Sequence, residues 1–376
     1  MKIVLAHHQD PDDIHAFSGT SYHMTRALRE HFDVVAEYRS FEPYTLFEEV
    51  LRKGLRPVLG PIGRKFSDYL QSNNIQADFV ICLGGNSSIP FYDHPTPIVF
   101  WHDSTWHTFL QSYQAPEYFR EFRTAAKNLY LWDKAVLEKA HLLAYSSQFI
   151  ADACIKDYKT PGKKINVIPF GANLQHPPSP AVLKEALERR LASPSIQLTF
   201  LGKDWKRKGL DLAYMLTKDL NQQGIPIWLN TIGCVPDFPE LYDSPFVTNF
   251  GLLDKSVKED MSTLEHVFRD THFLVHPASA EPFGIALCEA NAYGIPVIGT
   301  AVEGLGTIVR DGVNGFLYDR NTWLAAAQEL LKRLAADLDN TYPPLFNGSL
   351  EAYRSRLNWQ TNVLRLKDFL ADYKNA

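Results

Sequence analysis

Short apolar segments alternate with longer amphipathic segments along the first half of the chain. The short segments are rich in β-branched residues and almost continuously apolar, which is typical of strands buried on both faces of a parallel sheet. They comprise residues 2–8, 78–85, 97–103, 141–147 and 164–172. Helices are predicted between them by amphipathic patterns at residues 19–31, 62–73 and 132–140. This alternation predicts a doubly wound, Rossmann-like α/β domain over residues 1–173.

A polar, proline-bearing segment follows at residues 174–195 and reads "LQHPPSPAVLKEALERRLASPS". Because proline interrupts regular structure, this segment is predicted to be an interdomain linker. The alternation then resumes, with strands predicted at residues 196–203, 226–233, 245–251, 272–278, 295–300 and 315–319. It predicts a second Rossmann-like domain over residues 196–357. Two such domains leave a cleft between them, and clefts of this kind commonly bind ligands.

Composition narrows the class of protein. The chain has 376 residues, of which 45% are hydrophobic and 22% charged, as in a soluble protein of two domains. The net charge of -5 argues against a nucleic-acid partner. The four cysteines form no C-x-x-C pair, which suits a reducing cytoplasm. No signal peptide is recognisable, and no apolar run approaches the roughly 20 residues of a membrane span.

Two glutamates flank the start of a predicted helix in the second domain. The helix, at residues 283–293, follows the strand at residues 272–278, so it begins where parallel sheets bind ligands. Glu281 precedes the helix, and Glu289 lies roughly 9 Å along its axis. We expect a phosphate at the helix terminus, a ribose diol at Glu289 and a sugar hydroxyl at Glu281. The phosphate would contact the first amides, those of Phe283, Gly284, Ile285 and Ala286. From spacing alone, an alternative fits equally well, in which Glu281 is a solvated loop acid or a helix cap and Glu289 is an ion-paired surface residue.

A basic segment follows the first strand of the second domain. Gly202 ends the strand and is followed by Lys203, Lys206, Arg207 and Lys208. Such cations can neutralise a departing diphosphate without a metal ion. We expect Lys203 and Lys208 at the carboxyl edge of the sheet, although a solvated basic loop is the commoner origin of such a run.

The first domain offers weaker signals. Ser18, Gly19 and Thr20 form a small-residue loop that would admit a sugar or phosphate, and an ordinary helix cap at Ser18 fits as well. A lone histidine is more often structural than functional, but His102 ends a buried strand, and the carboxyl end of a strand favours function. The acidic run at residues 10–13, "DPDD", is interpreted as a solvated loop, because nothing nearby completes a metal site.

Together these segments resemble the group 1 retaining glycosyltransferases of family four, which have the GT-B fold. The most specific segment, residues 276–319, contains the E-x7-E pattern, a G-x-P turn and "DGVNGFL". Residues 164–173 and 200–209 also fit, as do residues 358–366. The resemblance implies an α/β GT-B fold with two Rossmann-like domains facing across a cleft. It further implies an acceptor-side first domain, a nucleotide-sugar-binding second domain, and a C-terminal helix at about residues 358–376 that packs back on the first domain.

The resemblance also implies an activity and residue roles. The expected reaction transfers a hexose from a UDP-sugar, UDP-glucose or UDP-glucuronic acid, to an acceptor hydroxyl with retention and without a metal or cofactor. The expected pathway is exopolysaccharide or glycolipid biosynthesis. By this resemblance Glu281 binds the sugar and Glu289 the ribose, Lys203 and Lys208 bind the diphosphate, Ser18 to Thr20 line the site, and His102 approaches the sugar. The chain departs from the family pattern at Lys203, usually arginine, at Asn173, usually aspartate, and in having one glycine in the first-domain loop.

Two alternatives remain for the function: a nucleotide-sugar epimerase of the same fold, and an inactive nucleotide-sugar-binding protein. A dehydrogenase is disfavoured because G-x-G-x-x-G is missing after the first strand. The acceptor is expected to be a carbohydrate or a lipid-linked sugar. Residues 50–66 interleave apolar residues with cations and could contact an anionic membrane peripherally, although core packing with a solvated basic face is slightly favoured. The cations are Arg52, Lys53, Arg56, Arg64 and Lys65.

Overall fold

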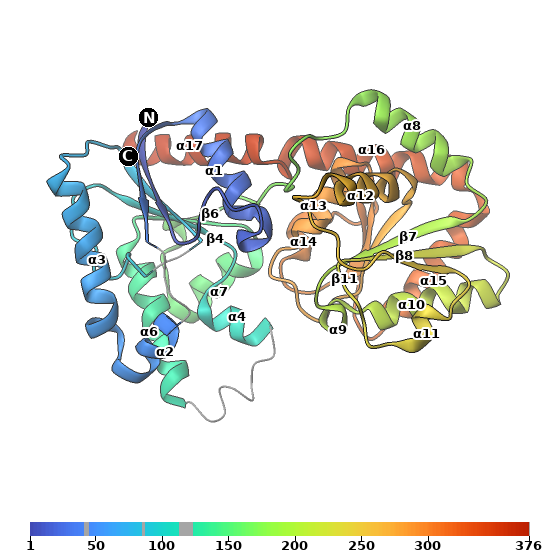
Figure 1. Ribbon diagram of the computed structural model, residues 1–376, viewed down its shortest axis with the longest axis horizontal. Helices are drawn as coiled ribbons and strands as arrows, with labels where there is room; N and C mark the ends of the chain where they lie inside the picture. The colour runs from blue at the N-terminus through green and yellow to red at the C-terminus, as the bar shows by residue number, and fades with distance from the viewer. Residues whose placement is uncertain (41–44, 85–86, 113–122, 376) are drawn as a thin grey trace. The chain divides into compact units, whose positions relative to one another are not determined.

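The computed structural model describes residues 1–40, 45–84, 87–112 and 123–375 of the protein (Figure 1). The chain divides into two compact units. The first comprises Met1–Phe170 and Trp359–Ala376, and the second comprises Gly171–Asn358. Each unit contains its own hydrophobic core around a parallel sheet. This is the predicted α/β architecture.

The described residues of the first unit form a six-stranded parallel sheet with the order β2-β1-β3-β4-β5-β6. The strands are β1 (Lys2–His7), β2 (Asp33–Arg39), β3 (Phe79–Leu83), β4 (Ile98–His102), β5 (Leu142–Tyr145) and β6 (Ile165–Val167). Residues of β3 and β5 are buried throughout, as their continuous apolar sequences predicted. Strand β2 was not predicted, because it lies at the edge of the sheet and its residues are only partly buried. The predicted strand at residues 78–85 ends in Gly85, which lies outside the described residues.

Helices cover this sheet. They are α1 (Thr20–His31), α2 (Thr45–Lys53), α3 (Leu55–Ser72), α4 (Trp106–Ser112), α6 (Arg123–Lys139), α7 (Gln148–Tyr158) and α17 (Trp359–Asn375), with short 3₁₀ turns at Ala16–Gly19 and Gly162–Lys164. The last helix, α17, lies beside α1 (Figure 1). Its Lys367 donates a hydrogen bond to the carbonyl of His31 at 3.1 Å. The ring of Trp359 packs on Trp101, with centroids 5.8 Å apart, so the C-terminal helix belongs to the first unit.

The second unit, within the residues described, also contains a six-stranded parallel sheet, with the order β12-β11-β10-β7-β8-β9. Its strands are β7 (Ile196–Leu201), β8 (Ile227–Ile232), β9 (Val247–Asn249), β10 (Phe273–His276), β11 (Val297–Thr300) and β12 (Gly315–Tyr318). Its helices are α8 (Pro180–Leu191), α9 (Trp205–Lys208), α10 (Leu210–Gln222), α11 (Pro239–Tyr242), α12 (Lys258–Asp270), α13 (Ile285–Ala292), α14 (Leu305–Ile308), α15 (Trp323–Ala336) and α16 (Leu338–Arg356). The direction of strand addition reverses between β7 and β10, which is where open α/β sheets bind ligands.

The segment predicted as a linker, residues 174–195, differs from the expectation because it contains α8. Proline at the first helical position needs no N–H partner, and Pro180 occupies that position next to the capping Ser179. Near the other end of α8, the guanidinium of Arg190 is fully buried. It donates hydrogen bonds to the hydroxyl of Tyr342 and to the carbonyls of Phe268, Arg269, Tyr293 and Gly294. Helix α8 is therefore an integral part of the second unit.

None of the helices in the described part of the chain combines the length and apolar character that a membrane span needs.

Candidate active site

The loop after β10 contains a buried carboxylate surrounded by cations. Glu281 is 8% exposed. Its Oε2 lies 3.1 Å from Lys208 Nζ, 3.1 Å from His276 Nε2 and 3.6 Å from Arg207 Nη1. Lys208 and Arg207 end α9, which follows β7, and His276 ends β10. The adjacent carboxyl ends of β7 and β10 thus bring together residues that are more than 70 positions apart in the sequence.

The charges of this cluster determine its protonation. Burial alone would raise the pKa of Glu281, but Lys208, His276 and Arg207 outweigh it and hold the pKa well below its usual value. Burial also lowers the pKa of His276. His276 is therefore neutral near pH 7 and donates its Nε2–H to Glu281. Its Nδ1 is buried and has no hydrogen-bond partner among the residues described. Sequence reasoning missed His276, although its position at the end of a buried strand was a usable signal.

Gly202 allows Lys208 to reach Glu281. A Cβ atom at position 202 would lie 2.2 Å from Lys208 Cδ, so any side chain there would displace the lysine stem. Arg207 is fixed by hydrogen bonds to the carbonyl of Ala280, at 2.6 Å, and to the carboxylate of Asp204, at 3.1 Å. Lys203, the other predicted diphosphate ligand, is exposed and has no hydrogen bond or ion pair in the described part of the chain. In the structure, therefore, Lys208 contacts Glu281 and Lys203 does not.

Helix α13 begins at Ile285, two residues later than predicted. Gly284 precedes it with a φ of 107°, which a helix cannot contain and which favours glycine. Phe283 is buried, whereas Ile285 and Ala286 are partly buried. Contacts of their amides with a phosphate remain a prediction.

The second glutamate of the pattern is also buried and ion-paired. Glu289 is 1% exposed, and its Oε1 accepts a hydrogen bond from Lys255 Nζ. Lys255 lies between β9 and α12. Glu289 is therefore ion-paired, as the alternative interpretation expected, but it is buried and does not lie at the surface. Sequence reasoning missed Lys255, because it lies 34 positions away in a loop with no recognisable motif.

In the first unit, His102 is held by aromatic rings and backbone groups. Its ring stacks on Phe17, with centroids 5.7 Å apart, and on Phe100 at 5.3 Å. Its Nε2 donates to the carbonyl of Gly84 at 2.8 Å, and its Nδ1 accepts from the amide of Ser104 at 3.1 Å. The predicted sugar-approaching histidine therefore has protein partners at both ring nitrogens.

The loop before α1 adopts left-handed backbone angles. The φ angles are 57° at Ser18 and 87° at Gly19. Gly19, rather than Ser18, is the N-cap of α1, and it forms no side-chain cap hydrogen bond. Thr20 is the first residue of the helix and is buried. The alternative of an ordinary cap at Ser18 is therefore wrong, and contact with a ligand remains a prediction.

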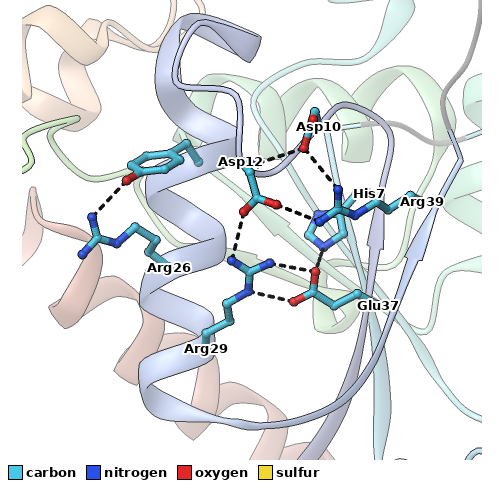
Figure 2. A network of polar contacts seen from close by, with 8 residues as sticks. His7, Asp10, Asp12, Arg26, Arg29, Glu37 and Arg39 are labelled. Carbon is cyan, nitrogen blue, oxygen red and sulfur yellow. Dashed lines mark hydrogen bonds and ion pairs between the residues drawn. The ribbon is translucent and has the colours of Figure 1, made fainter. Parts of the chain in front are cut away.

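Two acids of the run after β1, Asp10 and Asp12, pair with arginines, as Figure 2 shows. Asp12 pairs with Arg39 at 2.8 Å and with Arg29 at 3.3 Å, and Asp10 pairs with Arg39 at 3.4 Å. Arg29 also forms a bidentate pair with Glu37 of β2. Asp10 and Asp12 are thus engaged in ion pairs, and the residues described contain no group of side chains suited to hold a metal ion. This network fastens the loop that leads to residues 16–19.

Part of the second unit is similar to a known protein family. Residues 183–340 match the family model described as glycosyl transferases group 1. A D-inositol 3-phosphate glycosyltransferase from Xylanimonas cellulosilytica is 28% identical over 248 residues, which cover 64% of this chain and 58% of that protein. An uncharacterized 41.2 kDa protein in the cps region of Klebsiella pneumoniae is 27% identical over 192 residues, or 51% of each chain. The chain therefore spans about half the length of the curated relatives it matches.

Solved structures resemble the whole chain. Anabaena Alr3699/HepE in complex with UDP has a TM-score of 0.68 and 16% identity, and the match covers 99% of this chain and 100% of that one. Sucrose-phosphate synthase from Thermosynechococcus elongatus has a TM-score of 0.70 and 17% identity, with coverage of 100% and 99%. At these identities the likeness concerns the fold. The chain has the GT-B fold that these structures share, and its residues 183–340 match the model of the glycosyl transferases group 1 family.

Proposed function

We propose that the protein transfers a hexose from a UDP-sugar, UDP-glucose or UDP-glucuronic acid, to a carbohydrate or lipid-linked acceptor with retention of configuration. The observation that carries this proposal is the contact of Lys208 with Glu281 at the carboxyl edge of β7 and β10. A cation and a carboxylate 3.1 Å apart suit a ligand that carries a phosphate next to a hydroxyl. A sugar diphosphate has this arrangement.

The expected chemistry follows from these charges. The bond between C1 of the sugar and the diphosphate oxygen breaks, and the acceptor oxygen forms its bond to C1 on the same face. The acceptor proton passes to the departing phosphate oxygen. Negative charge grows on the diphosphate, and Lys208 and Arg207 lie beside Glu281 to neutralise it. We therefore expect activity without a divalent metal ion.

The choice of UDP rests on analogy. The HepE structures that resemble this chain contain UDP or UDP-glucose. We extend this preference to the present protein, together with a cytoplasmic role in exopolysaccharide or glycolipid biosynthesis.

A donor panel tests the proposal. The protein would be incubated with UDP-, GDP- and ADP-sugars in the presence of chelator, and nucleoside diphosphate release and melting temperature would be measured. Release from a UDP-sugar, lost in Lys208→Met and kept in Lys206→Met, is expected. Lys206 is the matched control, because it lies in the same short helix and is exposed. An isomerised nucleotide sugar without release would indicate an epimerase, and a melting shift without turnover would indicate an inactive binding protein.

We propose that residues 50–66 contact an anionic membrane peripherally, through their cations and not through their apolar side chains. Most apolar side chains of this segment are in the core, including Val50, Val58, Leu59 and Phe66, whereas the side chain of Leu51 lies outside the described residues. The cations Arg52, Lys53, Arg56, Arg64 and Lys65 are all exposed. Each would contribute about 1 kcal/mol near an anionic surface. Sedimentation with anionic liposomes at low salt should show binding that high salt or neutralisation of these cations abolishes. Failure to bind at low salt would leave a soluble acceptor.

A further inference from the structure

A loop lysine is paired with the buried carboxylate of α13. The side chain of Glu289 is 2% exposed, whereas that of Lys255 is 31% exposed. Within the described part of the chain, this is the ion pair that Glu289 forms. The pair therefore joins a carboxylate removed from water to a cation that still reaches solvent.

The loop that carries Lys255 is held in place by its own hydrogen bonds. The amide of Asp254 donates to the carboxylate of Asp260 at 2.8 Å. The carboxylate of Asp254 accepts hydrogen bonds from both the amide and the hydroxyl of Ser256, at 2.8 and 2.7 Å. The amide of Val257 donates to the carbonyl of Asp254 at 3.0 Å. Lys255 lies inside this turn, so its backbone is fixed on both sides.

Because Glu289 is buried, its pairing with Lys255 is energetically important. A carboxylate buried this deeply is costly without a counter-charge, and the ammonium of Lys255 supplies one. The ammonium of Lys255 contacts Oε1, which leaves Oε2 and the remaining lone pairs as acceptors for hydroxyl donors. A carboxylate accepts hydrogen bonds from hydroxyl groups more strongly than an uncharged oxygen does.

We propose that Lys255 is a positioning residue of the donor site, which orients Glu289 to accept hydrogen bonds from the ribose diol of the nucleotide. The inference rests on the proposed function, because it takes the ligand to be a nucleoside diphosphate. Lys255 thereby determines how well the site distinguishes ribose from 2′-deoxyribose, without itself contacting the sugar.

The test compares binding of UDP and 2′-deoxy-UDP by calorimetry. The wild-type protein is expected to prefer UDP by about 10- to 100-fold, the range that a hydrogen bond to a charged group provides. Lys255→Met should lose most of this preference, and Lys255→Arg, which keeps the charge, should retain it. Lys258→Met is the control, because Lys258 is exposed at the start of α12 and has no contact with Glu289.

The outcomes separate this inference from the proposed function. A purely structural lysine would lower the melting temperature of Lys255→Met without changing the ratio of the two affinities, and that result would overturn the inference. If Lys255→Met does not fold, Lys255→Gln takes its place; its ratio should fall between those of Lys255→Met and the wild type, and an unchanged ratio overturns the inference. Wild-type protein that binds both nucleotides equally would also refute it. Wild-type protein that binds neither would contradict the proposed function instead.

Discussion

The ring of Phe17 lies nearly parallel to the ring of His102, with centroids 5.7 Å apart and planes inclined by 17°. The backbone of Phe17 has a φ of 51°, a left-handed conformation that residues other than glycine rarely adopt. Ser18 follows with a φ of 57°. The backbone is therefore strained at Phe17 and Ser18, and this strained conformation places the ring of Phe17 on His102.

This strain predicts an unusual order of stabilities. Phe17→Gly should be more stable than Phe17→Ala by about 1 kcal/mol, because both lose the ring but glycine alone takes a positive φ without strain. Urea denaturation would measure the difference. The usual order, with alanine more stable than glycine, would show that the loop relaxes once the ring is removed.

Glu281 and Glu289 should affect different parts of the donor. Glu289→Ala is expected to weaken UDP itself by roughly 1.5–3 kcal/mol, the value of a charged hydrogen bond. Glu281→Ala should spare UDP and weaken the sugar donor or its turnover. Calorimetry with UDP, together with steady-state kinetics, separates the two effects. Equal losses of UDP affinity in both variants would contradict the assignment.

Lys208 should matter more for turnover than for binding. Charge on the diphosphate grows in the transition state, so Lys208→Ala is expected to lower kcat by about 100-fold, with a smaller effect on UDP affinity. Lys203→Ala should act in the same direction but more weakly, because Lys203 is exposed and does not contact Glu281. Chelator should leave the wild-type rate intact. A strict requirement for Mg²⁺ or Mn²⁺ would argue against cations as the substitute for a metal.

Arg190 is expected to be a large contributor to stability. Replacing it with methionine leaves the carbonyls at the ends of α12 and α13 without their donor, and each carbonyl left unsatisfied should cost about 1–3 kcal/mol. Its neighbour Arg189 pairs with Asp270 near the surface at 2.6 Å, so Arg189→Met should cost less than about 1 kcal/mol. Thermal unfolding of the two variants measures the contrast. Similar losses in both would mean that burial is not what makes Arg190 important.

His272 predicts a loss of stability in acid. Burial lowers its pKa from 6.5 to about 4, and the ring is held neutral between the amide of Gln197 and the carbonyl of Arg190. The unfolded chain takes up the proton first, so the free energy of unfolding should decrease as pH falls from 6.5 to 4. The decrease would be at most about 3 kcal/mol. Urea denaturation at a series of pH values should show a shallower dependence in His272→Gln; equal slopes would exclude this histidine as the cause.

Local sequence patterns predicted much of the fold and some of the site. Strand–helix alternation predicted two α/β domains because buried parallel strands must be apolar on both faces. The pattern failed at β2, whose residues are partly exposed at the sheet edge, and at α8, where Pro180 begins a helix instead of interrupting one. The spacing of Glu281 and Glu289 around α13 was visible because both lie near one short helix.

The contacts that give these residues their chemistry were decided by tertiary structure alone. Glu281 meets Lys208 because β7 and β10 are neighbours in the sheet, and Glu289 meets Lys255 because a loop after β9 reaches α13. Phe17 meets His102 across 85 positions of sequence. The apolar pattern determines which faces of the elements are buried, and this is a local property of the chain. Which charges share a buried site depends on the order of the strands and the course of their loops, which the packing of distant segments sets.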